Sequence, residues 1–175
     1  MKHGFFNTKQ CMLPITPEEF NEVACQIGFA VLQIQVLEQA LAVHLVLVHK
    51  VSVEMARSEI EKLFLKTEKR TLGQLFKDIH DTNRATPTLL LRLESFVKER
   101  NWLIHRCRHE NRTDFYSEVK RTVLIRRIGA IAEESLALQK AFQKATEDHS
   151  IAQGISRVEI ETRAAKIYQD WSKAN

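Results

Sequence analysis

Glycine and proline are scarce in this sequence, which has five Gly and three Pro among 175 residues. Folds built on tight turns use both residue types, so the shortage argues against such folds and favours long helices. The chain also lacks any strand-length run of alternating apolar and polar residues, and it has no internal repeat or low-complexity segment. These absences predict an all-α protein, a bundle of about five to six helices.

Cysteine is also scarce, and its spacing predicts no zinc site. The three cysteines, Cys11, Cys25 and Cys107, form no C-x-x-C pair. An odd number without such spacing indicates reduced thiols, as in a cytosolic protein. The first ten residues, MKHGFFNTKQ, lack the apolar core of a secretory signal peptide. We therefore expect a cytoplasmic location.

One apolar segment, residues 27–49, is long enough to cross a membrane. Five polar side chains interrupt it, and each would be costly in lipid: Gln33, Gln35, Glu38, Gln39 and His44. We therefore expect a helix buried in protein, with no membrane partner.

The length of the chain bears on the number of domains, and its charge bears on the class of partner. A chain of 175 residues can bury a real core, so we expect one domain over 1–175, with its helical core at about 17–147. The net charge of +4 and the pI of about 9.0 permit an anionic partner such as nucleic acid. Many proteins with this charge bind no nucleic acid, so basicity alone decides little.

Local capping signals predict where the helices begin. Thr16 followed by Pro17 and Glu19 predicts a long first helix ending near residue 50. Apolar spacing predicts a second helix over about 54–67. Thr71 with Gln74 opens a short third helix ending near residue 80.

Three further helices complete the predicted bundle. Thr86–Pro87 starts a helix over 87–108, and Thr113 or Asp114 starts another ending near residue 147. Ser156 begins a final amphipathic helix over about 156–172. Residues 109–112 and 147–154 are expected to be loops. The expected packing positions of the long helix after residue 113 are Val123, Leu124, Ile128, Ile131, Leu136 and Leu138.

The helix over 87–108 has a charged residue within its apolar face. At about 100° per residue, seven side chains share that face: Leu89, Leu93, Phe96, Val97, Leu103, Ile104 and Cys107. Arg100 falls near its centre, and Asn101 and His105 lie together at its edge. Burying an unpaired charge costs several kcal/mol. Arg100 therefore needs a buried carboxylate, or the face opens onto a cleft.

Glu38 is the candidate partner of Arg100. It lies in the apolar face of the first helix, so two apolar faces interrupted by opposite charges would meet at an Arg100–Glu38 pair. Such a pair could be a buried structural salt bridge. It could equally hold Arg100 in place for chemistry.

The chemistry that these residue types support is cleavage of RNA without a metal. The His105 imidazole can take a proton from a ribose 2′-hydroxyl or return one to a leaving oxygen. The Arg100 guanidinium can hold a phosphate and stabilise charge in the transition state. Asn101 could orient the imidazole ring or contact the substrate. The reaction needs both an acid and a base, and each chain supplies only one motif histidine. A homodimer would supply the second, which makes a homodimer attractive.

The segment RNWLIH, from Arg100 to His105, resembles the signature of the HEPN superfamily. That signature is an Arg, four to six intervening residues and a His, often with Asn or Asp directly after the Arg. Glu38 in a long first helix, and TLGQLF at 71–76 opening a short helix, are similar too. The resemblance spans roughly residues 17–145, and only the hexad is sharp.

The resemblance implies an α-helical bundle that dimerises through the motif helices, and a metal-independent endoribonuclease of toxin–antitoxin or phage-defence systems. It implies His105 as catalytic base or acid, Arg100 as the phosphate-binding group, Asn101 as a polar residue of the site and Glu38 as a partner that orients Arg100. An antitoxin or regulatory partner is also implied. One toxin branch has a Tyr two residues after the His, where this chain has Cys107, so neutralisation at that Tyr is not expected.

Basic and aromatic residues around the hexad are candidates for binding RNA. Arg106, Arg108 and Arg112 follow it, and further cations lie on the next helix: Lys120, Arg121, Arg126 and Arg127. They could track an RNA backbone or form a solvated face. Trp102 is expected to project away from the apolar face, as a base-stacking platform or as an interface or capping residue.

Metal and cofactor chemistry finds little support in the sequence. His105 and His109 are four residues apart and could ligate a metal, but no third ligand has convincing spacing. We expect no metal and no cofactor. The alternative to the ribonuclease is a non-catalytic helical module that binds RNA, a nucleotide or a protein partner, with Arg100 serving the structure.

Overall fold

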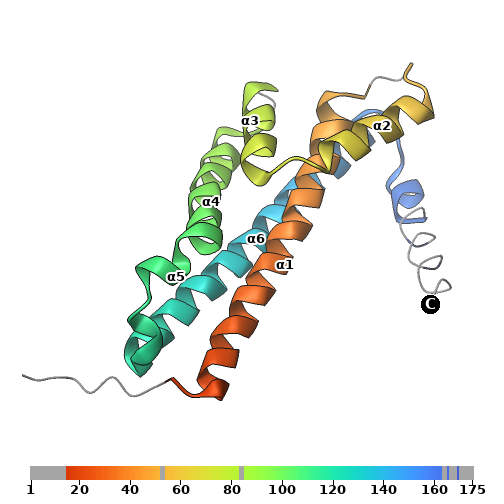
Figure 1. Cartoon of the computed structure of the whole chain (residues 1–175). Helices are drawn as coiled ribbons and strands as arrows, with labels where there is room; N and C mark the ends of the chain where they lie inside the picture. The colour runs from red at the N-terminus through yellow and green to blue at the C-terminus, as the bar shows by residue number, and fades with distance from the viewer. Residues whose placement is uncertain (1–14, 52–53, 83–84, 163–164, 166–168, 170–175) are drawn as a thin grey trace, which may run out of the picture.

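The computed structural model describes residues 15–51, 54–82 and 85–162, together with residues 165 and 169. Within these parts every regular element is a helix, and no strand is present. The prediction of an all-α bundle with a long first helix is confirmed (Figure 1). The elements are α1 (Pro17–His49), α2 (Arg57–Thr67), α3 (Leu72–Thr82), α4 (Pro87–His105), α5 (Cys107–Glu110), the 3₁₀ turn η1 (Asp114–Tyr116) and α6 (Glu118–Ala152).

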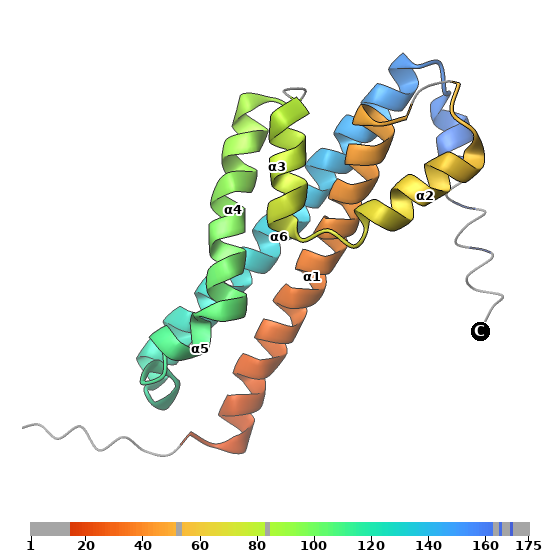
Figure 2. The same ribbon diagram turned by 45° about the horizontal axis from the view of Figure 1, so that its top comes forward.

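Helices α1 and α6 run side by side and parallel (Figures 1 and 2). Three polar contacts fix their register, and each joins residues 102 positions apart in the sequence. Arg121 pairs with Glu19. The Ser135 hydroxyl donates to the carbonyl of Gln33 at 2.9 Å, and His44 Nδ1 lies 2.9 Å from the Thr146 hydroxyl. The most extensive helix–helix contact in the bundle is therefore made by α1 and α6, the first and last elements along the chain.

Helix α4 packs against α6 in the antiparallel direction. Two salt bridges show this, because Arg92 pairs with Glu134 while Glu99, one heptad later in α4, pairs with Arg127, one heptad earlier in α6. Helix α3 lies beside α4 and contacts α1 (Figure 2). Four helices, α1, α3, α4 and α6, therefore form the bundle, and α3 and α6 hold α4 in place.

The core is aliphatic, with few aromatic rings. Burial of each leucine contributes about 1.5–3 kcal/mol, and the spacing of the leucines places them on one face of each helix. The largest fully buried side chains are Phe142, Leu37, Leu41, Leu45, Leu72, Leu75, Ile79, Leu93, Ile128, Leu138, Val23 and Val46.

The predicted helix starts are confirmed by hydrogen bonds. Thr16 and Glu19 form a reciprocal capping box with distances of 2.9 and 3.2 Å. Thr71 and Gln74 form a second one at 3.0 and 3.5 Å. The hydroxyl of Thr86 accepts from the backbone N–H of Leu89 at 3.4 Å. Caps use contacts three residues apart, so the local sequence suffices to find them.

The predicted boundaries of α6 are wrong at both ends. Residues 114–116 form η1 instead of the first turn of α6, and Arg121 fixes that turn by donating to the carbonyl of Phe115 at 2.9 Å. At the other end the helix continues to Ala152, through most of the predicted loop. The stop signal is Gly154, whose φ of +94° ends the helix while the N–H of Ile155 donates to Ser150.

Two of the predicted packing positions of α6 are also wrong. Val123 and Leu136 are exposed, whereas Leu124, Ile128, Ile131 and Leu138 are buried as predicted. The helix is covered by α1 on one side and α4 on another, and these two residues face neither core. Of the predicted C-terminal helix over 156–172, residues 157–162 are helical. Most of the remainder lies outside the described residues.

Helix α1 is long and apolar enough to cross a membrane by length and composition. Of its most apolar 18-residue stretch, 44% is buried inside the bundle. The core helix of a soluble protein meets the same criteria, so this observation does not place the chain in a membrane.

Candidate functional site

The three motif residues lie on the last two turns of α4. Arg100 points into the bundle, with 20% of its side chain exposed, whereas Asn101 and His105 are exposed. Asn101 and His105 are four residues apart, which places them one above the other on the helix surface. The end of α4 therefore carries a half-buried guanidinium and two accessible polar groups.

The predicted contact between Arg100 and Glu38 is present. Arg100 Nη2 lies 3.4 Å from Glu38 Oε1, and 23% of the Glu38 side chain is exposed. The same carboxylate oxygen accepts from the backbone N–H of Leu72 at 3.2 Å. Leu72 is the first residue of α3, where unpaired N–H groups and the helix dipole favour a negative charge. Glu38 therefore joins α1, α3 and α4.

The Arg100 guanidinium is held loosely compared with other arginines of the bundle. Its second hydrogen bond runs from Nη1 to Asn101 Oδ1 at 3.3 Å. Within the described part of the chain its buried Nε has no hydrogen-bond partner. By contrast, Arg92 and Arg127 each form two hydrogen bonds of 3.0–3.1 Å with one carboxylate. A buried donor without a partner costs about 1–3 kcal/mol, so Arg100 is not optimised as a structural bridge.

Helix α4 ends at His105, three residues before the predicted end. Arg106 has φ −126° and ψ −20°, and α5 begins at Cys107. His109 therefore lies on a different helix from His105, so the two are not one turn apart on a single helix, as the metal alternative assumed. Residues 109 and 110 belong to α5 and not to the predicted loop.

Of the two roles expected for Trp102, that of a base-stacking platform is wrong, because the ring is buried. It is 2% exposed. Its indole Nε1 donates to Glu110 Oε2 at 2.8 Å, and the Arg127 guanidinium lies 3.5 Å from its ring centroid. Helices α5 and α6 cover the side of α4 that carries Trp102. A helical wheel of α4 alone gives no information on these two neighbours. Conversely, Ile104, predicted to be buried, is 41% exposed.

The basic residues near the motif divide into paired and unpaired groups. Arg106 lies 3.7 Å from Glu110, and Lys120 lies 3.3 Å from Asp114. Arg121 is buried, so it cannot contact RNA as proposed from sequence. Arg108 and Arg112 are exposed and line a pocket described below.

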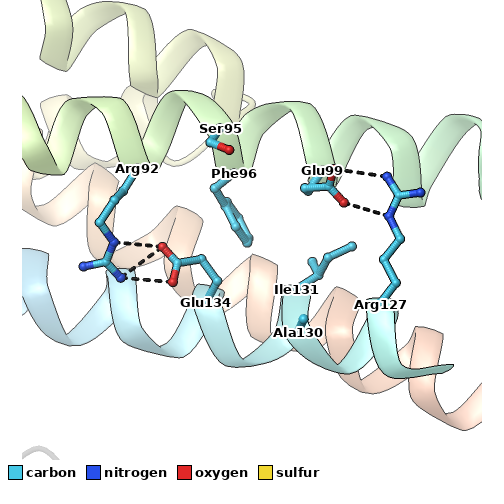
Figure 3. Close-up of a pocket in the computed structure, with 8 residues that line it drawn as sticks. All are labelled: Arg92, Ser95, Phe96, Glu99, Arg127, Ala130, Ile131 and Glu134. Atoms are coloured by element: carbon cyan, nitrogen blue, oxygen red, sulfur yellow. Dashed lines mark hydrogen bonds and ion pairs between the residues drawn. The ribbon is translucent and has the colours of Figure 1, made fainter. Parts of the chain in front are cut away.

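One cavity of about 370 Å³ lies between α4 and α6 (Figure 3). Phe96 and Ile131 lie between two salt bridges that cross from one helix to the other, Arg92–Glu134 and Glu99–Arg127 (Figure 3). Its charges neutralise one another in pairs. None of the three motif residues lines this cavity.

A second cavity of about 370 Å³ lies between the start of α1 and the segment from α5 to η1. Arg108 and Arg112 line it together with three aromatic side chains, Phe20, Phe115 and Tyr116. The sequence analysis selected the two arginines but none of the aromatic residues. Phe20 is far from the arginines in the sequence, so no local pattern could find it, whereas Phe115 and Tyr116 follow Arg112 closely and were the available signal.

Burial perturbs the pKa of His44 on α1 and that of Cys107 on α5. Burial lowers the pKa of His44 to about 4, with further lowering by the charges of His49 and His149. Burial also raises the pKa of the Cys107 thiol. A protonated His44 and a Cys107 thiolate are therefore both disfavoured in the folded protein.

Comparison of the chain with models of known protein families, with curated proteins and with solved structures finds no match. The case for a function therefore depends on the residues of the site and on the resemblance of the segment Arg100–His105 to the HEPN signature. Of the four residues that this resemblance assigns to catalysis, Glu38, Arg100 and Asn101 are joined by hydrogen bonds, and His105 ends the same helix.

Proposed function

We propose that the protein is a metal-independent endoribonuclease of the HEPN type, acting in phage defence or as a toxin. The observation that carries the proposal is the arrangement at the end of α4, where a loosely bonded Arg100 is hydrogen-bonded to exposed Asn101, and exposed His105 lies one helical turn after Asn101. A guanidinium whose Nη hydrogen bonds are as long as 3.3 and 3.4 Å, on the same helix end as an accessible imidazole, suits a phosphodiester substrate better than it suits a purely structural role.

In the proposed reaction the ribose 2′-oxygen attacks the adjacent phosphorus. One His105 imidazole accepts the 2′-hydroxyl proton as the new P–O bond forms, and the P–O5′ bond breaks. A second, protonated imidazole donates a proton to the leaving 5′-oxygen. The products are a 2′,3′-cyclic phosphate and a 5′-hydroxyl. Arg100 stabilises the charge that develops on the phosphate oxygens, and Glu38 positions Arg100.

Two imidazoles require two copies of the chain. A two-fold axis near the motif would place His105 of each copy in one composite site. Exposed Ile104 lies on the same stretch of α4, and it supplies apolar surface that a partner copy could cover. Homodimerisation through α4 therefore forms part of the proposal.

The test is cleavage of a mixed RNA pool by the purified protein in excess EDTA. The expected result is cleavage by the wild type, with 2′,3′-cyclic phosphate ends, and at least a hundredfold loss in His105→Ala. His80→Ala is the matched control, because His80 is an exposed helical histidine on α3 and should retain wild-type cleavage. Equal cleavage by His105→Ala, or no cleavage by a folded wild-type dimer, would refute the proposal.

A specific observation favours a second candidate, a non-catalytic module that binds RNA, a nucleotide or a protein. The Glu38 carboxylate both caps α3 and pairs with Arg100, which is what a structural network requires. On this reading Arg100→Ala destabilises the fold, and His105→Ala changes no property of the protein. The cleavage assay above separates the two candidates.

A further inference from the structure

The pocket at the foot of the bundle has the composition of a ligand site. It lies where the start of α1 and the segment after α5 come together, at the lower end of the molecule in Figure 1. Val23, Ala24 and Ile27 of α1 form apolar walls, and Phe20 and Tyr116 are each about half exposed at its margin. Its volume of about 370 Å³ falls within the range of small-molecule sites.

The two arginines of this pocket have no carboxylate partner among the described residues, and this distinguishes them from their neighbours. Arg106, Lys120 and Arg121 each pair with an acid, but neither Arg108 nor Arg112 forms an ion pair with any residue that the structure describes. Residues 1–14, which precede the pocket in the chain, contain no Asp or Glu. Both guanidinium groups are therefore available to an anion from another molecule.

The cavity between α4 and α6 provides the comparison. It has the same volume and also contains two arginines, but each is paired with a glutamate at 3.0 Å (Figure 3). An anion entering there would have to displace a carboxylate. An anion at Arg108 and Arg112 displaces only water, so charge complementarity selects the pocket at the foot of the bundle.

Aromatic walls beside unpaired guanidinium groups match one class of ligand, a nucleotide with an unpaired base. A base can stack on Phe20 or Tyr116, and its flanking phosphates can accept hydrogen bonds from the arginines. A base within a duplex cannot enter such a pocket, because it is stacked and paired. Arg108 is three residues after His105, just beyond the break at Arg106, so the pocket borders the motif along the chain.

We propose that this pocket binds one unpaired base of single-stranded RNA, with the flanking phosphates on Arg108 and Arg112. It thereby selects the nucleotide that lies beside the bond to be cut. The identity of the ligand as RNA rests on the proposed ribonuclease function. The binding site itself rests on the unpaired arginines and the aromatic walls.

The experiment measures binding of a short single-stranded RNA that carries 2′-O-methyl groups and so cannot be cleaved, using fluorescence anisotropy. The double variant Arg108→Gln/Arg112→Gln should bind at least tenfold more weakly. The slope of log K against log salt should also fall by about 1.4, the value for two phosphate contacts on a single strand. The matched control is Lys62→Gln/Lys66→Gln, which removes the same charge from two exposed positions on α2 and should bind like the wild type.

Stacking is tested separately at Tyr116. Tyr116→Ala should weaken binding by roughly 5- to 150-fold, the range for loss of one stacked base, with no change in the salt slope. Tyr116→Phe should restore wild-type binding, because it retains the ring. Circular dichroism of each variant verifies that the helices are intact.

The outcomes distinguish failure of this inference from failure of the proposed function. Weaker binding by the pocket variants, without RNA cleavage by the wild type, supports the pocket and refutes the ribonuclease. Cleavage that depends on His105, with normal binding by the pocket variants, supports the ribonuclease and overturns the pocket. Equal binding of duplex and single-stranded RNA, or no RNA binding by the wild type, also overturns the pocket.

Discussion

His44 should make the stability of this protein depend on pH. Its side chain is 4% exposed, and its ring meets Phe142 and His49 edge-on, with centroid distances of 5.0 and 5.3 Å. The Thr146 hydroxyl donates its one proton to the carbonyl of Phe142 at 2.8 Å. It must therefore accept from Nδ1–H of His44, and burial keeps the imidazole neutral in the folded state.

The magnitude follows from the pKa of His44, which burial lowers from 6.5 to about 4. Between these values the unfolded chain binds a proton at His44 and the folded chain does not. The free energy of unfolding should therefore fall as the pH drops below 6.5, by up to about 1.4 kcal/mol per pH unit. By pH 4 the accumulated loss from this one group is about 3 kcal/mol.

Urea unfolding, monitored by helical circular dichroism at pH 7.5, 6.5, 5.5 and 4.5, measures this loss. His44→Asn removes the titration and retains an amide donor for Thr146, so its stability should decline less than that of the wild type by about 2.5 kcal/mol across the range. His80→Asn, at an exposed histidine, should decline like the wild type. If His44→Asn and the wild type lose stability in parallel, the buried neutral imidazole is the wrong explanation.

Three further predictions concern other parts of the bundle. Trp102→Ala should destabilise the protein by about 3–5 kcal/mol in urea unfolding, because it empties a buried site; a loss below about 1 kcal/mol would mean that the ring is exposed. Arg100→Ala should lower the free energy of unfolding by about 1–2 kcal/mol, and Glu38→Ala should lower it further, because the Glu38 carboxylate also caps α3. A larger loss for Arg100→Ala than for Glu38→Ala in urea unfolding would contradict the role assigned to Glu38. A thiol reagent should modify exposed Cys25 rapidly and buried Cys107 only on unfolding, as peptide mapping can follow; rapid modification of both would show that α5 is not packed as described.

Much of the fold could be predicted because the signals are local. Helix starts were found at Thr16, Thr71 and Thr86, where the capping contacts span three residues. The ends were less accurate, since α4 breaks at Arg106 and α6 continues to Ala152. A helix end depends on what packs beyond it as much as on its own residues.

The contact between Arg100 and Glu38 could also be predicted, although the residues are 62 positions apart. A charge within an apolar face requires a partner, and the first helix offered one carboxylate in its own apolar face. The same reasoning gave no information on how well the pair is bonded. The additional role of Glu38 at the start of α3 follows only from the fold, since Leu72 approaches it through the path of the chain after α2.

The helical class, the helix starts and the motif near the end of α4 follow from the sequence alone, because composition, capping and periodicity are local properties. The parallel direction of α1 and α6, the burial of Trp102 and the pocket that Phe20 shares with Arg108 and Arg112 follow only from the packing of the helices. Each of these depends on which helix covers which face. That choice is made by packing between segments far apart in the chain, and no local pattern specifies it.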